Sequence, residues 1–430
     1  MPITTVPPNW LCGLSSILDK IINAKKPMTN EEYISAHQSD DVRRLALASV
    51  PEGVDARWCL QQIEGRQLAR RKLPLWAQTE GVYYPPHLSM EQCSSEITAL
   101  YKRRVVEHLL PAVADRQSIA DLTGGFGVDF SYLAPIFAKA YYFEQQPELC
   151  HIAKHNFPLL GLTGAEVINA DTADVAVWAR RHYTLLYIDP ARRDGVGRKT
   201  VAIEDCVPDV TTIQEDLLAN SRLVMLKLSP MLDISMALRR LRHVSEIHVV
   251  SVKGECRELL LVLSLCGGPQ QITCTNLQTA DPTICCIAQE AWLTHAECTD
   301  EMGDFIYEPN ASLLKAGVQD LVALRYGLLK LHRDSNLFTG STLCPSFPGR
   351  IFRVTAVSRF AKHNLRQLLA DVQQANLTVR NFPATVAELR KRLKLREGGD
   401  TYLFATTSAN GSHILIRCHK VVKNTDYDTF

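Results

Sequence analysis

The sequence predicts an α/β protein built on an open, doubly wound sheet with a reversed strand at one edge. Three observations support this prediction. Short runs of Val, Ile, Leu and Tyr alternate with helical stretches between about Gln117 and Leu265, a pattern typical of parallel strands joined by crossover helices. A glycine-rich turn, ADLTGGFGVDF (Ala120–Phe130), follows the first of these runs. The last two runs are joined only by KGECRE, which is too short for a parallel crossover.

The apolar runs place the strands of this sheet. We expect seven strands, at 119–121, 140–143, 166–169, 185–188, 223–228, 247–252 and 259–265. The region before them, from about Met28 to Pro111, shows helical spacing of apolar residues, as in TNEEYISAHQSDDVRRLALASV. After CGGPQQ, short strand-like runs and helices mix, which favours small α+β units. We therefore predict four parts, with boundaries at 1–112, 113–268, 269–345 and 346–430.

Length and composition bound the class of protein. The chain has 430 residues, of which 46% are hydrophobic and 22% charged, as in a soluble globular protein. No apolar run reaches the ~18 residues of a membrane span, and the start lacks the features of a signal peptide. We expect a cytoplasmic protein without a membrane partner. The net charge of +1 argues against a whole-surface attraction to nucleic acid but allows a local basic patch.

The 13 cysteines are scattered and contain no C-x-x-C pair. This spacing indicates neither a zinc site nor a disulfide framework, so we expect reduced, mostly buried thiols and no metal. Cys256 lies in the KGECRE connection, but no base is identifiable near it. A nucleophilic role for Cys256 is therefore not favoured.

Notable residues follow four of the predicted strands. In an open α/β sheet, ligands bind at the carboxyl ends of the strands. The first strand ends at Asp121, just before Gly124, Gly125 and Gly127, and the second ends at Glu144, about twenty residues after the glycines, where a carboxylate can accept ribose hydroxyls. Asp171 follows the third strand, and Asp189 with Pro190 follows the fourth. Together these residues predict a site for a nucleoside-containing ligand.

Each acidic residue also has a purely structural interpretation. Glu144 alone would be a solvated charge at a strand end, Asp171 a helix cap, and Asp189 with Pro190 a turn. Their joint placement beside a glycine turn favours the functional interpretation. A dinucleotide site would bring a pyrophosphate to the glycines, and the acid just ahead of them, Asp121, would repel it. S-adenosylmethionine has no phosphate and carries an amino group and a sulfonium, so it suits Asp121 better.

At this point the chain resembles class I methyltransferases, across about Gln117 to Leu265. The segments DLTGGFGVD, DPARR, KLSP and EQCSSEITALYK look more closely like a bacterial family of such enzymes with a C-terminal THUMP-like domain. The resemblance implies a Rossmann-like methyltransferase sheet followed by ferredoxin-like and THUMP-like domains. It also implies that SSEITALYK covers the methionine end of the cofactor, with Ser95 and Thr98 as candidates. The candidate cofactor-binding residues are Asp121, Thr123, Gly124, Gly125, Gly127, Glu144, Asp171 and Thr172.

The DPARR segment stands where amino-group methyltransferases carry an Asp/Asn-Pro-Pro-aromatic motif. In that motif the acid or amide and a proline carbonyl accept hydrogen bonds from the target amine, and the aromatic side chain stacks on its ring. This chain keeps Asp189 and Pro190, which are the candidate catalytic residues, but lacks the aromatic. Arg192 and Arg193 follow, and they would either bind substrate phosphate or carboxylate or form salt bridges with nearby acids.

Lys227 interrupts an otherwise apolar strand, VMLKLSP. A buried lysine needs a partner, and Asp189 on the neighbouring strand is the expected one. We therefore include Lys227 among the catalytic candidates, as a residue that orients Asp189.

A basic run, ELRKRLKLREGGD, lies near the C-terminus. It is either a solvated helix face or, as the resemblance to THUMP-like domains implies, a phosphate-contacting surface with Lys391, Arg392 and Lys394 as substrate-binding candidates. The resulting hypothesis is an S-adenosylmethionine-dependent methyltransferase that acts on an amino nitrogen of RNA. The alternatives are a non-enzymatic RNA-binding protein with a cofactor fold and a methyltransferase of a small anionic molecule. The sequence does not predict the oligomeric state.

Overall fold

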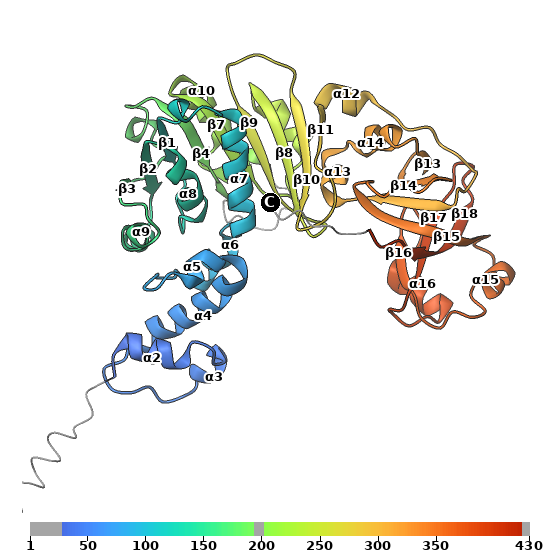
Figure 1. Cartoon of the computed structure of the whole chain (residues 1–430), viewed down its shortest axis with the longest axis horizontal. Helices are drawn as coiled ribbons and strands as arrows, with labels where there is room; N and C mark the ends of the chain where they lie inside the picture. Colours follow the sequence, from blue (N-terminus) through green and yellow to red (C-terminus); the bar gives the residue numbers. More distant parts are fainter. Residues whose placement is uncertain (1–27, 193–201, 424–430) are drawn as a thin grey trace, which may run out of the picture. The chain divides into compact units, whose positions relative to one another are not determined.

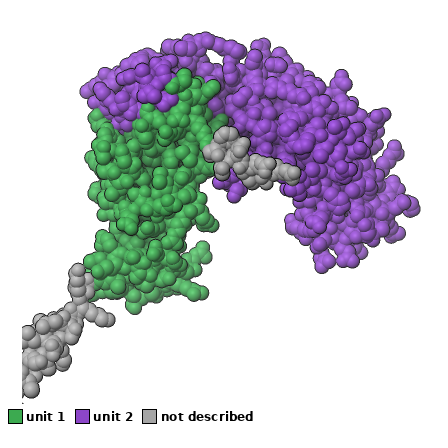
Figure 2. All heavy atoms as spheres, in the orientation of Figure 1, with its two compact units in different colours: residues 1–111, 124–136, 144–169 green, residues 112–123, 137–143, 170–430 purple. Residues whose placement is uncertain are grey.

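The structure is a computed structural model, and it describes residues 28–192 and 202–423. The chain forms two compact units, which interleave along the sequence (Figure 2). The first unit comprises residues 1–111, 124–136 and 144–169, and the second comprises residues 112–123, 137–143 and 170–430.

The first unit is mainly helical, as the N-terminal periodicity predicts (Figure 1). Thr29 caps its first described helix in a capping box with Glu32, and Ser95 caps the last helix before the glycine turn. A buried apolar cluster around Trp76, Tyr84 and Phe126 joins the N-terminal helices to the segment after the glycines. The unit contains α2 (Asn30–His37), α3 (Val42–Leu45), α4 (Ala56–Lys72), α5 (Pro74–Gln78), α6 (His87–Gln92), α7 (Glu96–Leu109), α8 (Val128–Leu133), α9 (Pro147–Leu159) and the strand β3 (Ala165–Asn169).

A large sheet forms the first half of the second unit (Figure 1). The strands of the sheet that precede β3 lie in the order β11, β10, β8, β9, β7, β4, β1, β2. The central strands are apolar and buried on both faces, as expected where helices cover a parallel sheet. The strands are β1 (Ser118–Asp121), β2 (Lys139–Glu144), β4 (Tyr183–Ile188), β7 (Ser221–Leu228), β8 (Val244–Val252), β9 (Glu255–Leu263), β10 (Gln271–Leu277) and β11 (Ile284–Ile287). The helices α10 (Val210–Ala219) and α11 (Ile234–Arg240) connect them.

Two features of this sheet differ from the sequence prediction. The reversed strand, β9, was expected at an edge but lies inside the sheet, because it pairs with β7 on one side and with β8 on the other. The sheet also continues past the boundary expected at residue 269. Residues Gln271–Leu277 pair in parallel with Glu246–Val252, so β10 satisfies the backbone groups on the outer side of β8.

The second half of this unit contains a further sheet, in the order β13, β14, β12, β15, β18, β17, β16. Its core includes Phe352, Phe404 and Ile416, and a second apolar cluster around Leu389 and Leu403 packs helices on it. The strands are β12 (Phe305–Pro309), β13 (Leu329–His332), β14 (Ser335–Gly340), β15 (Gly349–Arg359), β16 (Asn376–Val379), β17 (Thr401–Thr407) and β18 (His413–Lys420). The helices are α12 (Ala288–Leu293), α13 (Ala311–Ala316), α14 (Gln319–Arg325), α15 (Lys362–Leu368) and α16 (Val386–Leu393).

Within residues 28–192 and 202–423, no helix is long and apolar enough to cross a membrane.

Candidate active site

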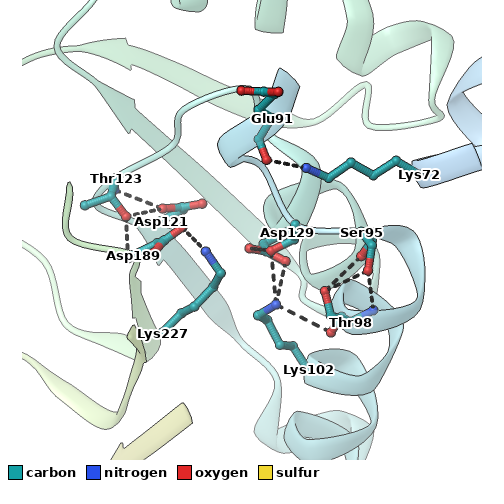
Figure 3. Close-up of polar contacts among 11 residues, drawn as sticks. Lys72, Glu91, Ser95, Thr98, Lys102, Asp121, Thr123, Asp129, Asp189 and Lys227 are labelled. Carbon is teal, nitrogen blue, oxygen red and sulfur yellow. Dashed lines mark hydrogen bonds and ion pairs between the residues drawn. The ribbon is translucent and has the colours of Figure 1, made fainter. Parts of the chain in front are cut away.

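The turn after β1 is tied to the end of β4. The Thr123 amide donates to Asp121 Oδ1 (2.9 Å), and the Thr123 hydroxyl accepts from the Asp189 amide (2.6 Å), as Figure 3 shows. The same hydroxyl lies 3.4 Å from Asp121 Oδ1, to which it donates. One side chain therefore links the acid at the end of β1 to the main chain of the acid after β4. Thr123, expected among the cofactor-binding residues, has this connecting position.

Asp189 and Lys227 form an ion pair between Oδ2 and Nζ (Figure 3). Ile188 of β4 is in register with Leu226 of β7. Asp189 and Lys227, the next residues in the chain, are therefore neighbours near the carboxyl ends of β4 and β7. The Lys227 side chain is 13% exposed and the Asp189 side chain 35% exposed. The ion pair predicted for Lys227 is thus present, and the Asp189 carboxylate remains partly accessible to solvent. The main chain of Ala191–Arg192 forms a short strand, β5, paired with β6 (Cys206–Val207), and Arg193 lies outside the described residues.

The glycine turn belongs to the first unit. The Gly127 amide donates to the Gly124 carbonyl (2.9 Å) and closes the turn. Gly125 has φ 59° and Gly127 has φ 85°, values in the left-handed region that glycine adopts without steric cost. Gly127 then serves as the N-cap of α8. Gly125 and Gly127 therefore allow a backbone path that other residues would strain.

Glu144 is almost fully buried, with 7% of its surface exposed. Its Oε2 accepts from the Gly125 amide (2.8 Å), and its Oε1 accepts from the Gln146 amide (2.8 Å). This carboxylate is therefore not the solvated strand-end charge of the structural interpretation. Each of its oxygens has a further lone pair, so the carboxylate can still accept hydroxyl groups.

The structure gives Asp171 and Thr172 different positions. Asp171 is exposed, and its side chain accepts from the Ala173 amide (2.9 Å) in a local turn. The helix cap of the structural interpretation is not formed by Asp171, because Asp174 caps the short helix that follows. Thr172 is buried, and its hydroxyl donates to the Leu122 carbonyl (2.7 Å), next to Asp121 in the chain. Thr172 thus supports the turn after β1.

Ser95 and Thr98, at the start of α7, form hydrogen bonds with each other. The Ser95 side chain accepts from the Thr98 amide (3.4 Å), and the two hydroxyl oxygens lie 3.2 Å apart (Figure 3). Three further residues of this region, Ser94, Lys102 and Asp129, form a buried polar cluster. This cluster was not among the residues predicted from the sequence. A signal was available, because Ser94, Thr98 and Lys102 recur every four residues around the start of a helix whose inner face is buried.

The basic run near the C-terminus falls on and just after α16. Leu389 faces the core, while Lys391, Arg392 and Lys394 are exposed. The Arg392 guanidinium lies over the Phe360 ring, 4.8 Å from its centre. Arg390 instead donates to the Ala375 carbonyl (3.3 Å), so it contributes to the fold of this region.

No group of His, Cys, Asp and Glu among the described residues has the arrangement of a metal site. Burial raises the pKa of the Cys256 thiol above its ordinary value, as it does for Cys274 and Cys286. These thiols therefore stay protonated near neutral pH, which makes them poor nucleophiles.

Comparisons with known proteins place these observations in a family. Residues 349–420 match the family described as THUMP domain-like, and residues 305–348 match a ferredoxin-like domain family. The chain is 33% identical to a proposed methyltransferase of Porphyromonas gingivalis W83, whose crystal structure aligns with TM-score 0.80 over 91% of this chain and 98% of that one. It is also 26% identical, over 315 residues, to uncharacterised S-adenosylmethionine-dependent methyltransferases of two Mycobacterium tuberculosis strains, CDC 1551 and H37Rv. That match covers 72% of this chain and 82% of each relative.

Proposed function

Because the chain belongs to the family of S-adenosylmethionine-dependent methyltransferases with a C-terminal THUMP-like domain, we propose that it methylates an amino nitrogen of RNA in the cytoplasm. The family confirms the resemblance inferred from DLTGGFGVD and DPARR, and it establishes both the enzyme class and the cofactor, S-adenosylmethionine. The non-enzymatic alternative is therefore not retained. The observation that carries the proposal for the acceptor is the Asp189–Lys227 pair at the carboxyl ends of β4 and β7.

The acceptor groups of the chain fit this cofactor. Asp121 is a buried carboxylate that would accept a hydrogen bond from an amino group, and Glu144 would accept ribose hydroxyls. Asp121 lies just ahead of the glycines, where it would repel a pyrophosphate. When bound, S-adenosylmethionine supplies an electrophilic methyl group on a sulfonium. The chain then has to hold the acceptor in line with that group and exclude water.

Asp189 would bind and orient the acceptor. Its accessible carboxylate side can accept a hydrogen bond from an amine N–H, which directs the nitrogen lone pair away from the acid. Lys227 would fix the carboxylate from its buried side, and the Thr123 hydroxyl would fix its main chain. The Pro190 carbonyl would supply a second acceptor, as in the amino-group motif that DPARR resembles.

The C-terminal domain would hold the RNA. Its THUMP-like character supports this role, and the exposed cations Lys391, Arg392 and Lys394 supply charges for phosphate contacts. Such contacts position a strand without reading its sequence. We also propose that the catalytic domain extends through β11, so that the ferredoxin-like part begins near residue 305.

Nucleoside profiles of cellular RNA test the substrate directly. Deleting the protein should remove one methylated nucleoside, and the parent protein should restore it. A variant with Lys391, Arg392 and Lys394 changed to alanine should restore much less, because each lost phosphate contact weakens RNA binding. A matched variant with alanine at Arg43, Arg44 and Arg57, exposed cations of the first unit, should restore it fully.

An RNA profile unchanged by the deletion would contradict the proposal. It would favour the alternative substrate, a small anionic molecule. If both triple variants restored the methylated nucleoside equally, the basic run at Lys391, Arg392 and Lys394 would be a solvated helix face without a role in RNA binding.

A further inference from the structure

The contact between α7 and α8 contains a buried charge. Lys102 of α7 is 0% exposed, and its ammonium lies 3.1 Å from Asp129 Oδ1 (Figure 3). The same ammonium donates to the Ser94 hydroxyl oxygen (3.2 Å), and the Ser94 hydroxyl donates to Asp129 Oδ2 (2.7 Å). Each of the three side chains thus contacts the other two, and the Asp129 side chain is only 9% exposed.

Stability alone does not explain this cluster. The neighbouring buried residues of α7 include Ala99, Val105 and Val106, which form an ordinary apolar helix face. Burying an ammonium and a carboxylate carries a large desolvation cost, and apolar residues of similar volume often stabilise such a position equally well or better. A buried ion pair with a shared hydrogen-bond partner adds directional constraints, because charge-assisted hydrogen bonds require specific distances and angles.

That geometry acts next to the glycine turn. Asp129 is the second residue of α8, and it follows Gly127, the N-cap, by two positions. Glycine is the most conformationally free residue, so the order of the turn depends on the contacts that hold it. Besides the Glu144 contact, Phe126 within the turn enters the apolar cluster with Trp76, and Asp129 just after the turn is held by α7.

The electrostatic environment of Tyr132 agrees with the same docking of α8 on α7. Burial, and then the Glu96 carboxylate, raise the pKa of Tyr132 above its ordinary value. Tyr132 lies one turn after Asp129 on α8, and Glu96 is the first residue of α7. The Leu75 amide donates to the same Glu96 carboxylate (2.9 Å), so α7 also joins α8 to α5.

We propose that Lys102, Asp129 and Ser94 are positioning residues for the cofactor. They hold α8 on α7 so that the glycine turn keeps the backbone arrangement that binds S-adenosylmethionine. None of the three needs to contact the cofactor. This inference rests on the cofactor of the family and not on RNA as the substrate.

The test is a double variant in the full-length protein, Lys102→Met with Asp129→Leu. Replacing both partners avoids an unpaired buried charge, so the melting temperature should stay at or above that of the parent. S-adenosylmethionine should nevertheless bind at least roughly tenfold more weakly by titration calorimetry, a loss of ~1.4 kcal/mol. Arg103→Met is the matched control, because Arg103 pairs with Glu107 on the partly exposed side of α7. This control should bind the cofactor like the parent.

A stable double variant with parental cofactor affinity would overturn the inference and leave the cluster a structural role only. If the double variant does not fold, Ser94→Ala decides, because it removes one hydroxyl and keeps the ion pair. We expect Ser94→Ala to weaken cofactor binding roughly two- to tenfold, in line with the loss of a buried hydrogen bond. Parental affinity in that variant would equally overturn the inference.

Discussion

The glycine-turn region of the first unit and the strand-end region of the second unit hold their acidic groups in different ways. Glu144 is 7% exposed, and both of its oxygens accept from main-chain amides. Asp189 is 35% exposed, and the Lys227 side chain holds one of its oxygens. Main-chain amides therefore hold Glu144 in place. Asp189 is held by a side-chain ion pair at a partly exposed strand end.

This difference fits the two ligands of a methyltransferase. A group held by main-chain amides is preorganised, which suits a cofactor that binds in one fixed pose. An acid with an accessible side can receive an acceptor that arrives on a macromolecule. If this comparison is right, changes in the first region should act on cofactor binding, and changes in the second should act on transfer.

The largest expected effect separates the two regions through Asp189. Asp189→Ala removes the group that we propose orients the acceptor, so methyl transfer should fall by at least roughly 10²-fold. Cofactor affinity should remain close to that of the parent. The measurement is incorporation of labelled methyl groups into RNA from cells lacking the protein, with cofactor titration alongside.

Asp216→Ala is a suitable control for this variant. Asp216 is an exposed acid on α10, and its change should leave both quantities unaltered. Parental turnover in Asp189→Ala would exclude Asp189 from the reaction. A loss of cofactor affinity equal to the loss of transfer would show that the two regions do not act separately.

The next effect concerns Glu144. Glu144→Ala removes a charged acceptor, and we expect S-adenosylmethionine binding to weaken by ~1.5–3 kcal/mol, the range for hydrogen bonds to charged groups. Calorimetry measures the affinity, and thermal unfolding shows whether the protein remains folded without the two amide contacts. Glu148→Ala, an exposed carboxylate on α9, should change neither. An affinity unaffected by Glu144→Ala would contradict the assignment of this acid to the cofactor.

The sequence predicted the sheet well because its strands are defined by local pattern. The run YTLLYI, for example, is buried along its whole length as β4. Strand order is set by pairing between distant segments, and it leaves little local trace. The sequence analysis therefore placed β9 at an edge and ended the sheet before β10, whereas the backbone groups of β8 pair with both strands.

The site shows the same division between local pattern and tertiary contact. A lysine within an apolar strand predicted the Asp189–Lys227 pair, because burial forces a charge to find a partner. Asp171 was predicted as a cofactor residue from its position after a strand, and the structure adds that its carboxylate accepts from the Ala173 amide two residues along the chain. Its role at the cofactor stays a prediction. The Lys102–Asp129 pair joins two helices separated by β1, so only the folded chain brings these charges together.

The smallest expected effect concerns Thr123, because its side chain joins Asp121 at the end of β1 to Asp189 after β4. Its hydroxyl accepts from the Asp189 amide (2.6 Å) and donates to Asp121 (3.4 Å). Thr123→Val keeps the shape and removes the hydroxyl, which should cost ~0.5–1.5 kcal/mol of transition-state stabilisation, or a roughly two- to twelvefold slower transfer. Thr123→Ser keeps the hydroxyl and should retain most of the parental rate.

Because Thr123 acts on the position of Asp189, the loss in Thr123→Val should appear in turnover more than in cofactor affinity. Equal rates for the valine and serine variants, with both proteins folded, would show that this hydrogen bond does not position the acid.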